Sequence, residues 1–296
     1  MTDLSKEIRI HHDSIDGLNE DLIQSFHTLS IGHTGCMYKM ISLSDQSLIR
    51  ISEIGKRVKI EIPVLFDAHF DWFQRNLDRW LKYSDHLVVN DWGTLSYLHE
   101  KGISSEVELS LGRKLAHSYF HSPWSVYIFQ EEEAADTESW SELNLANNEM
   151  VEWLKESRIN EIEIDPLPQL IPSIQYLRSS GFKINGFHGY PLVSMSRSCH
   201  TLRYFDEKKG NCQHLCNTAI QLGAKERWNR FEDVMEHISK PIREELGQFL
   251  VYGNIVVQNK QIEIENIEKE MDSWIFDSRF SPKIELKKYK NEVTIL

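Results

Sequence analysis

Short apolar runs rich in β-branched residues alternate with longer, more polar segments along the first two thirds of the chain. Each run has the length and composition of a buried strand, with polar or turn-forming residues at its ends. Strands that alternate with helices in this way are typical of parallel βα units. The predicted strands are residues 8–12, 27–33, 58–66, 86–91, 106–111, 124–129, 159–165 and 182–190.

The segments between several of these runs have the periodicity of amphipathic helices. In residues 71–84, apolar side chains recur every three or four positions, which places them on one face of a helix. Residues 141–157 and 228–238 repeat the pattern, and Pro241 ends or kinks the second of these helices. The alternation of strands and helices therefore predicts an α/β fold.

Eight strands before residue 190 favour a closed barrel over an open sheet. The last fifty residues break the alternation, because residues 249–268 have the pattern of strand, turn and strand. We therefore expect a TIM-barrel-like parallel βα barrel over residues 1–245. A small C-terminal β-rich elaboration, residues 246–296, is expected to pack on the same domain.

Composition narrows the classes of partner. The 296 residues include 45 acidic and 33 basic side chains, for a net charge of −12, which repels nucleic-acid phosphates and makes a small-molecule substrate the better expectation. No run approaches the ~18 apolar residues of a membrane span, and the N-terminus has no apolar signal region. We expect a cytoplasmic protein with no membrane contact, in which the cysteines are thiols or metal ligands.

The four cysteines are the strongest chemical signal. Cys199, Cys212 and Cys216 lie within eighteen residues, and Cys36 lies far upstream. Cys212 and Cys216 are one helical turn apart, which would put both thiols on one face. Three interpretations remain open on spacing alone: unrelated buried thiols, a structural zinc site, or a 4Fe–4S cluster, which tolerates one remote ligand.

Several segments around these cysteines resemble the collagenase-like peptidase family, U-thirty-two in peptidase classification, and in particular its short UbiV-like iron–sulfur branch. The likeness extends in the same order over about residues 27–220. The matching segments are "GHTGC" (32–36), "VVNDWGTLSYLHEKG" (88–102), "EIDPLPQLIP" (163–172), "PLVSMSRSC" (191–199) and "GNCQHLC" (210–216).

This resemblance implies a TIM-barrel-like fold and a 4Fe–4S cluster on all four cysteines. It also implies oxygen-independent hydroxylation of an organic substrate, with prephenate as the oxygen donor, in a heterodimer with a second family member. A non-catalytic iron–sulfur partner or electron-transfer subunit is the alternative, and a peptidase comes third. The sequence departs from the family at His33 and in the "MYKM" that follows Cys36, and it lacks the long C-terminal extension of the peptidase-type members.

Arginines beside Cys199 are candidates for anion binding. Arg197 and Arg203 would stabilise an anionic cluster, and the guanidinium of Arg197 would also hold a substrate carboxylate in a bidentate manner. For Arg203, a surface ion pair is an equally good interpretation.

Five further polar residues lie at or near predicted strand ends, where barrels place functional side chains. Asn90 and Asp91 end one strand, although Asp91 is equally well placed to cap the next helix. Glu163 and Asp165 lie two apart on one strand and point to the same side, as acid/base or substrate-orienting candidates. His188 is a candidate proton donor or a hydrogen-bonded structural residue.

Overall fold

The computed structural model describes most of the chain, and the account below is confined to that part. The described residues are 4–17, 20–122, 125, 141–205, 212, 216, 219–221, 249–259, 266–280, 287–289 and 292–294.

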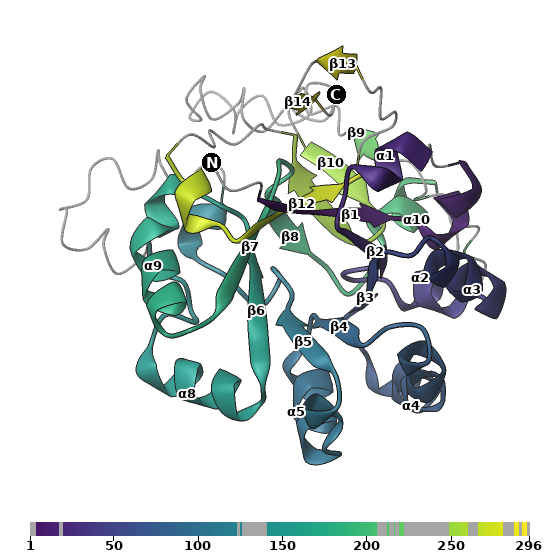
Figure 1. Ribbon diagram of the computed structural model, residues 1–296, viewed down its shortest axis with the longest axis horizontal. Helices are drawn as coiled ribbons and strands as arrows, with labels where there is room; N and C mark the ends of the chain where they lie inside the picture. The colour runs from purple at the N-terminus through teal and green to yellow at the C-terminus, as the bar shows by residue number, and fades with distance from the viewer. Residues whose placement is uncertain are drawn as a thin grey trace, which may run out of the picture.

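Eight parallel strands close a barrel, which confirms the predicted TIM-barrel-like α/β fold (Figure 1). β1 pairs with β12 on one side and with β2 on the other, so strands from the two ends of the chain complete the ring. In order around the barrel the strands are β1 (Ser5–Ile10), β2 (Thr28–Gly32), β3 (Arg57–Ile62), β4 (His86–Val89), β5 (Glu108–Leu111), β6 (Ile159–Ile164), β7 (Lys183–Phe187) and β12 (Ser273–Asp277).

Seven of the eight predicted strands correspond to β1–β7. The remaining predicted strand, residues 124–129, lies outside the described residues apart from Ser125. The eighth strand of the barrel is β12, which lies within the segment 246–296 that the sequence assigned to an elaboration. A barrel strand therefore follows the cysteine-rich segment in the chain.

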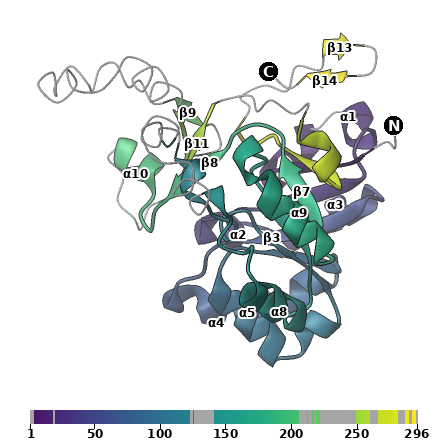
Figure 2. The same ribbon diagram turned by 90° about the vertical axis from the view of Figure 1, so that its left-hand side faces the viewer.

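Helices surround the barrel (Figures 1 and 2). The α-helices are α1 (Glu20–Gln24), α2 (Met37–Ile41), α3 (Asp45–Glu53), α4 (Asp67–Leu81), α5 (Trp92–Glu100), α8 (Asn148–Glu156), α9 (Ile171–Ser179) and α10 (His200–Tyr204). Short 3-10 helices are η1 (His12–Gly17), η2 (Ile103–Ser105), η3 (Tyr119–His121), η5 (Pro168–Leu170) and η7 (Glu268–Glu270). None of the described helices is long and apolar enough to cross a bilayer.

The predicted helices form where capping and periodicity agree. α4 starts four residues before the predicted segment 71–84 and ends at Leu81, and it buries Phe73, Leu77 and Trp80 against the barrel. α8 is shorter than the predicted 141–157, because the side chain of Asn147 accepts a hydrogen bond from the Met150 N–H and starts the helix there. The predicted helix 228–238 lies outside the described residues.

A second, antiparallel sheet lies between β7 and β12 in the chain. Its strands, in spatial order, are β8 (Leu192–Met195), β11 (Ile255–Gln258), β10 (Phe249–Tyr252) and β9 (Ile220–Gln221). Figure 2 shows this sheet grouped with α10 to one side of the barrel. The sheet spans the expected boundary at 245/246. A separate hairpin is formed by β13 (Lys287–Tyr289) and β14 (Glu292–Thr294).

Charged side chains fill the interior of the barrel. Arg9 of β1 pairs with Glu163 of β6, a strand that is not its neighbour, so the contact crosses the interior. The Arg9 guanidinium also reaches Glu61 Oε1 at 2.8 Å, and Lys59 Nζ lies 2.7 Å from Glu161 Oε2. The isoleucines that alternate with these residues belong to the core beneath the helices. Paired polar groups thus line the inside of the barrel, and apolar side chains pack between its outer face and the helices.

Candidate functional site

All four cysteines line one cavity at the C-terminal end of the barrel. Cys36 follows β2, and Phe66, another lining residue, follows β3. Cys199, Cys212 and Cys216 line the same cavity from the segment between β8 and β10. The fold therefore brings together residues that the sequence holds far apart. This is the face on which TIM barrels carry their functional residues.

Two of the cysteines occupy helix N-caps. Cys36 is the N-cap of α2, and Cys199 is the N-cap of α10, where its Sγ accepts a hydrogen bond from the Leu202 N–H at 3.4 Å. Burial raises the pKa of both thiols, and nearby backbone N–H groups offset part of that increase. Such N–H groups favour the thiolate form that metals bind.

Cys216 has the smallest exposed fraction of the four cysteines. Cys216 is buried, whereas the other three cysteines are half-buried. Burial raises the pKa of Cys216 to about 12, the positive charge of Lys39 lowers it in part, and the charges of the other three thiols raise it further. The four thiols are therefore close enough to influence one another, and a metal that binds them must displace protons.

In the described part of the chain, no three of the thiol sulfurs lie within 4.8 Å of one another. Among the described residues, the one group of three or more metal-type ligand atoms within 4.8 Å of one another is His86, Glu108 and Glu161, which contains no cysteine. Four sulfurs around one zinc at its usual bond length would lie about 3.8 Å apart. The sulfur ligands of a cluster stand farther apart, because several irons separate them.

A buried cation and an exposed cation also line the thiol cavity. Lys39 is 1% exposed, and its Nζ lies 3.6 Å from Asp13. Arg197 lines the same cavity from an exposed position, whereas Arg203 is exposed on α10. Lys39 was not predicted from the sequence, because a single lysine in "MYKM" does not indicate burial.

The turn between β10 and β11 fixes the two cysteine loops relative to each other. Asn254 Nδ2 donates to Gly35 O at 2.9 Å and to Ser196 O at 3.0 Å. The carbonyl of Gly253 accepts from the His200 and Thr201 N–H groups. One turn therefore holds the loop of Cys36 and the loop of Cys199 together.

An aromatic stack lies behind the thiol cavity. The His33 ring is parallel to the Tyr252 ring, 4.8 Å away, and Tyr252 Oη is 2.6 Å from His11 Nε2. Burial lowers the pKa of His33 to about 3, so the imidazole is neutral. Its Nδ1 accepts hydrogen bonds from the N–H groups of Gly35 and Cys36, both at 3.0 Å, and so orients the Cys36 loop.

Asn90 and Asp91 have structural partners. Asn90 is buried and donates to Ile62 O at 2.9 Å. Asp91 caps α5 by accepting from the Thr94 N–H at 2.7 Å, which was the alternative interpretation of this residue. Neither residue lines the thiol cavity.

Glu163, Asp165 and His188 lie apart from the thiols. Glu163 is fully buried, and burial raises the pKa of its carboxyl to about 8 despite its pairing with Arg9. Asp165 is buried at the end of β6 and accepts from Arg113 and from the Leu192 N–H, both at 2.9 Å. The His188 ring stacks on Phe276 at 4.7 Å. None of these three lines the cavity that contains the cysteines.

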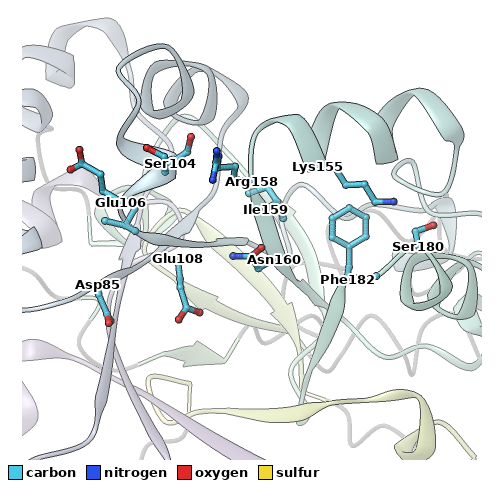
Figure 3. A pocket seen from close by; sticks show the side chains of 13 residues that line it. Asp85, Ser104, Glu106, Glu108, Lys155, Arg158, Ile159, Asn160, Ser180 and Phe182 are labelled. Atoms are coloured by element: carbon cyan, nitrogen blue, oxygen red, sulfur yellow. The ribbon is translucent and has the colours of Figure 1, made fainter.

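A larger cavity of about 600 Å³ lies at the opposite, N-terminal end of the barrel (Figure 3). Charged residues of both signs line it, including Glu106, Glu108 and Arg158. Glu108 also belongs to the group of possible metal ligands, but Arg57 pairs with Glu108, and Lys59 pairs with Glu161. Both carboxylates are therefore already paired with cationic side chains.

No protein-family model and no curated protein sequence matches the chain. Solved structures match at low similarity. A U32 peptidase is 10% identical with a TM-score of 0.40, over 93% of this chain and 92% of that chain. Muconate lactonizing enzyme from Pseudomonas putida is 10% identical with a TM-score of 0.36, over 62% of this chain and 46% of that one. A dipeptide epimerase from Methylococcus capsulatus is 13% identical with a TM-score of 0.35, over 62% and 48%.

Proposed function

We propose that Cys36, Cys199, Cys212 and Cys216 bind a 4Fe–4S cluster and that the protein uses it in oxygen-independent hydroxylation of an organic substrate. One observation supports cluster binding above the others: every cysteine in the chain lines the same cavity. Four unrelated core thiols would have no reason to converge from two distant segments.

The chemistry of the cavity suits an iron–sulfur cluster. The four ligands are thiols, the soft ligands that hold such clusters. Lys39 supplies a buried positive charge beside the anionic group that four thiolates would form. When bound, such a cluster supplies an electron-transfer centre or a Lewis-acidic iron.

The hydroxylation part of the proposal rests on the sequence resemblance to the UbiV-like branch. In that scheme prephenate is the oxygen donor and the chain works as one subunit of a heterodimer. Arg197 is exposed on the rim of the cavity, where it would hold an anionic substrate group. The alternative, in the same site, is an iron–sulfur subunit that transfers electrons without binding the substrate.

Anaerobic purification followed by metal and sulfide analysis tests the cluster. Brown protein with broad visible absorption and about four iron and four sulfide per chain supports it. Colourless protein with about one zinc per chain overturns it. Hydroxylation of a reporter substrate under argon, with and without prephenate, then separates the catalytic role from the electron-transfer role.

A further inference from the structure

Three fully buried arginines lie at the C-terminal mouth of the barrel, and one of them is incompletely paired. Every side-chain nitrogen of Arg9 has a carboxylate partner. Every side-chain nitrogen of Arg279 also has an acceptor, on Asp277, Glu61 or Gly32. Arg113 is only 2% exposed, yet its Nε and Nη2 have no hydrogen-bond partner among the described residues.

The free nitrogens of Arg113 form the side of the guanidinium that recognises carboxylates. Nη1 is used, since it donates to Asp165 Oδ1 and to Tyr190 O, both at 2.9 Å. Nε and Nη2 carry two parallel N–H bonds, the arrangement that pairs with both oxygens of one carboxylate. A buried donor without an acceptor is destabilising, so an acceptor is expected there.

The surroundings hold this guanidinium in a fixed orientation. Its Cζ lies 3.8 Å from the centre of the Phe187 ring and 5.8 Å from that of Phe280. Phe187 ends β7 and Arg113 follows β5, so two barrel strands fix the stacked pair. Such stacking orders the planar fork and lowers the entropic cost of binding an anion.

A further unpaired nitrogen lies on the other side of Asp165. His121 Nδ1 lies 3.0 Å from Ser118 N and 3.1 Å from Ser118 O, so either ring nitrogen can carry the proton. Nε2 has no hydrogen-bond partner among the described residues and lies 3.7 Å from Asp165 Oδ2. Burial lowers the pKa of His121, which keeps it neutral. Because Asp165 already offsets the charge of Arg113, a singly charged anion fits better than a phosphate.

We propose that Arg113 binds the carboxylate of a small organic acid through Nε and Nη2, beside Asp165 and His121 at the C-terminal mouth of the barrel. This site is distinct from the thiol cavity. The Phe280 and Tyr252 rings, 5.2 Å apart, lie between Arg113 and His33, which orients the Cys36 loop. Arg113 does not line the thiol cavity, so this proposal does not depend on whether the cysteines bind a cluster.

The test follows the Arg113 Nε–H by NMR in wild-type protein labelled with nitrogen-15 arginine. Its contact with the Phe187 ring protons assigns the signal, so no variant needs to fold. Titration with sodium benzoate should shift this signal with a Kd of about 1 mM or below. Arg113→Lys should weaken benzoate binding about tenfold or more, because lysine keeps the positive charge but lacks the two parallel N–H bonds of the guanidinium. Arg75→Lys, at an exposed position on α4, is the matched control and should bind as wild type.

Two outcomes overturn the inference. One is a Nε–H signal that benzoate does not move, and the other is an equal shift with sodium chloride, which would indicate a site for any anion. Cys212→Ala separates this result from the proposed function. It should lose metal and keep benzoate binding, whereas loss of both would show that the two sites are one.

Discussion

Cys36 and Cys199 are the N-cap residues of two five-residue helices, α2 and α10, and both thiols line the same cavity. Helix N-caps present backbone N–H groups to whatever the cap side chain binds. The two halves of the site therefore use the same local geometry, although one follows β2 and the other follows β8. We therefore expect Cys36, which is remote in the sequence, to contribute as much to metal binding as the three clustered cysteines.

Replacing any one of the four cysteines by alanine should lower the iron content of anaerobically purified protein by at least about half, because each thiolate holds one corner of the cluster. Iron and sulfide analysis of the four single variants measures this. Ser198→Ala, next to Cys199, is the control and should keep full iron. A Cys36→Ala protein with full iron would mean that the fourth ligand is another group.

Metal uptake by the thiol cavity should weaken as the pH falls. Burial raises the pKa values of Cys36, Cys199 and Cys216, so these thiols hold their protons at neutral pH and must release them on binding. The apparent affinity for cobalt should rise about tenfold or more per pH unit between pH 6 and 8. Cobalt–thiolate absorption reports the titration. Uptake that is independent of pH would show that the thiols are not the ligands.

Lys39→Met should make a bound cluster less durable. The lysine is buried in the wall of the thiol cavity, so its charge is poorly screened by solvent. We expect the visible absorption of the reconstituted protein to decay about 2–10-fold faster than that of wild type. Lys82→Met, an exposed position at the end of α4, should decay at the wild-type rate. Equal decay of all three proteins would contradict a role for Lys39 as counter-charge.

Asn254→Ala should impair the site without removing a ligand. The side chain donates to Gly35 O and Ser196 O, and the variant leaves both carbonyls without this partner. We expect a loss of about 1–3 kcal/mol in the free energy of unfolding and lower iron occupancy. Asn160→Ala, at an exposed position, is the matched control. Full occupancy in Asn254→Ala would show that the two loops hold their positions independently.

Glu163→Gln should stabilise the fold more at high pH than at low pH. Burial raises the pKa of Glu163 from 4.5 to about 8, so the folded protein binds this proton more tightly than the unfolded chain does. That contribution is fully present below pH 4.5 and is lost as the pH rises through about 8. Urea unfolding at pH 5 and pH 8 measures the difference between variant and wild type, with Glu156→Gln as control. A difference that shrinks as the pH rises would contradict the raised pKa.

Seven barrel strands could be predicted from the sequence, because each is a continuous pattern of a few neighbouring residues. β1–β7 are apolar runs bounded by polar residues, and each matches a predicted strand. The eighth strand was missed because residues 273–277 follow an insertion that interrupts the alternation. Its partner, β1, lies at the other end of the chain, and no local pattern indicates such a pairing.

The charged barrel interior carried a signal that was only partly used. In "VKIEI" and "NEIEI", charged residues alternate with isoleucine, and Lys59, Glu61, Glu161 and Glu163 are all buried. Alternation of this kind normally indicates a strand with one solvated face. The polar face is indicated to point inward only because positive and negative side chains occur on strands of the same barrel. Inside the barrel these charges neutralise one another.

The pairing of β1 with β12, in the register Ser5↔Ser273, has a consequence for how the protein folds. The barrel cannot close until residue 277 has left the ribosome, because β1 pairs with β12, the last barrel strand to be synthesised. Until then β1 and β7 each expose an unpaired edge, which invites association between nascent chains. During the same interval all four cysteines have been synthesised, because Cys216 precedes β12 in the chain. The thiol cavity therefore takes its final form only after its last cysteine has been made.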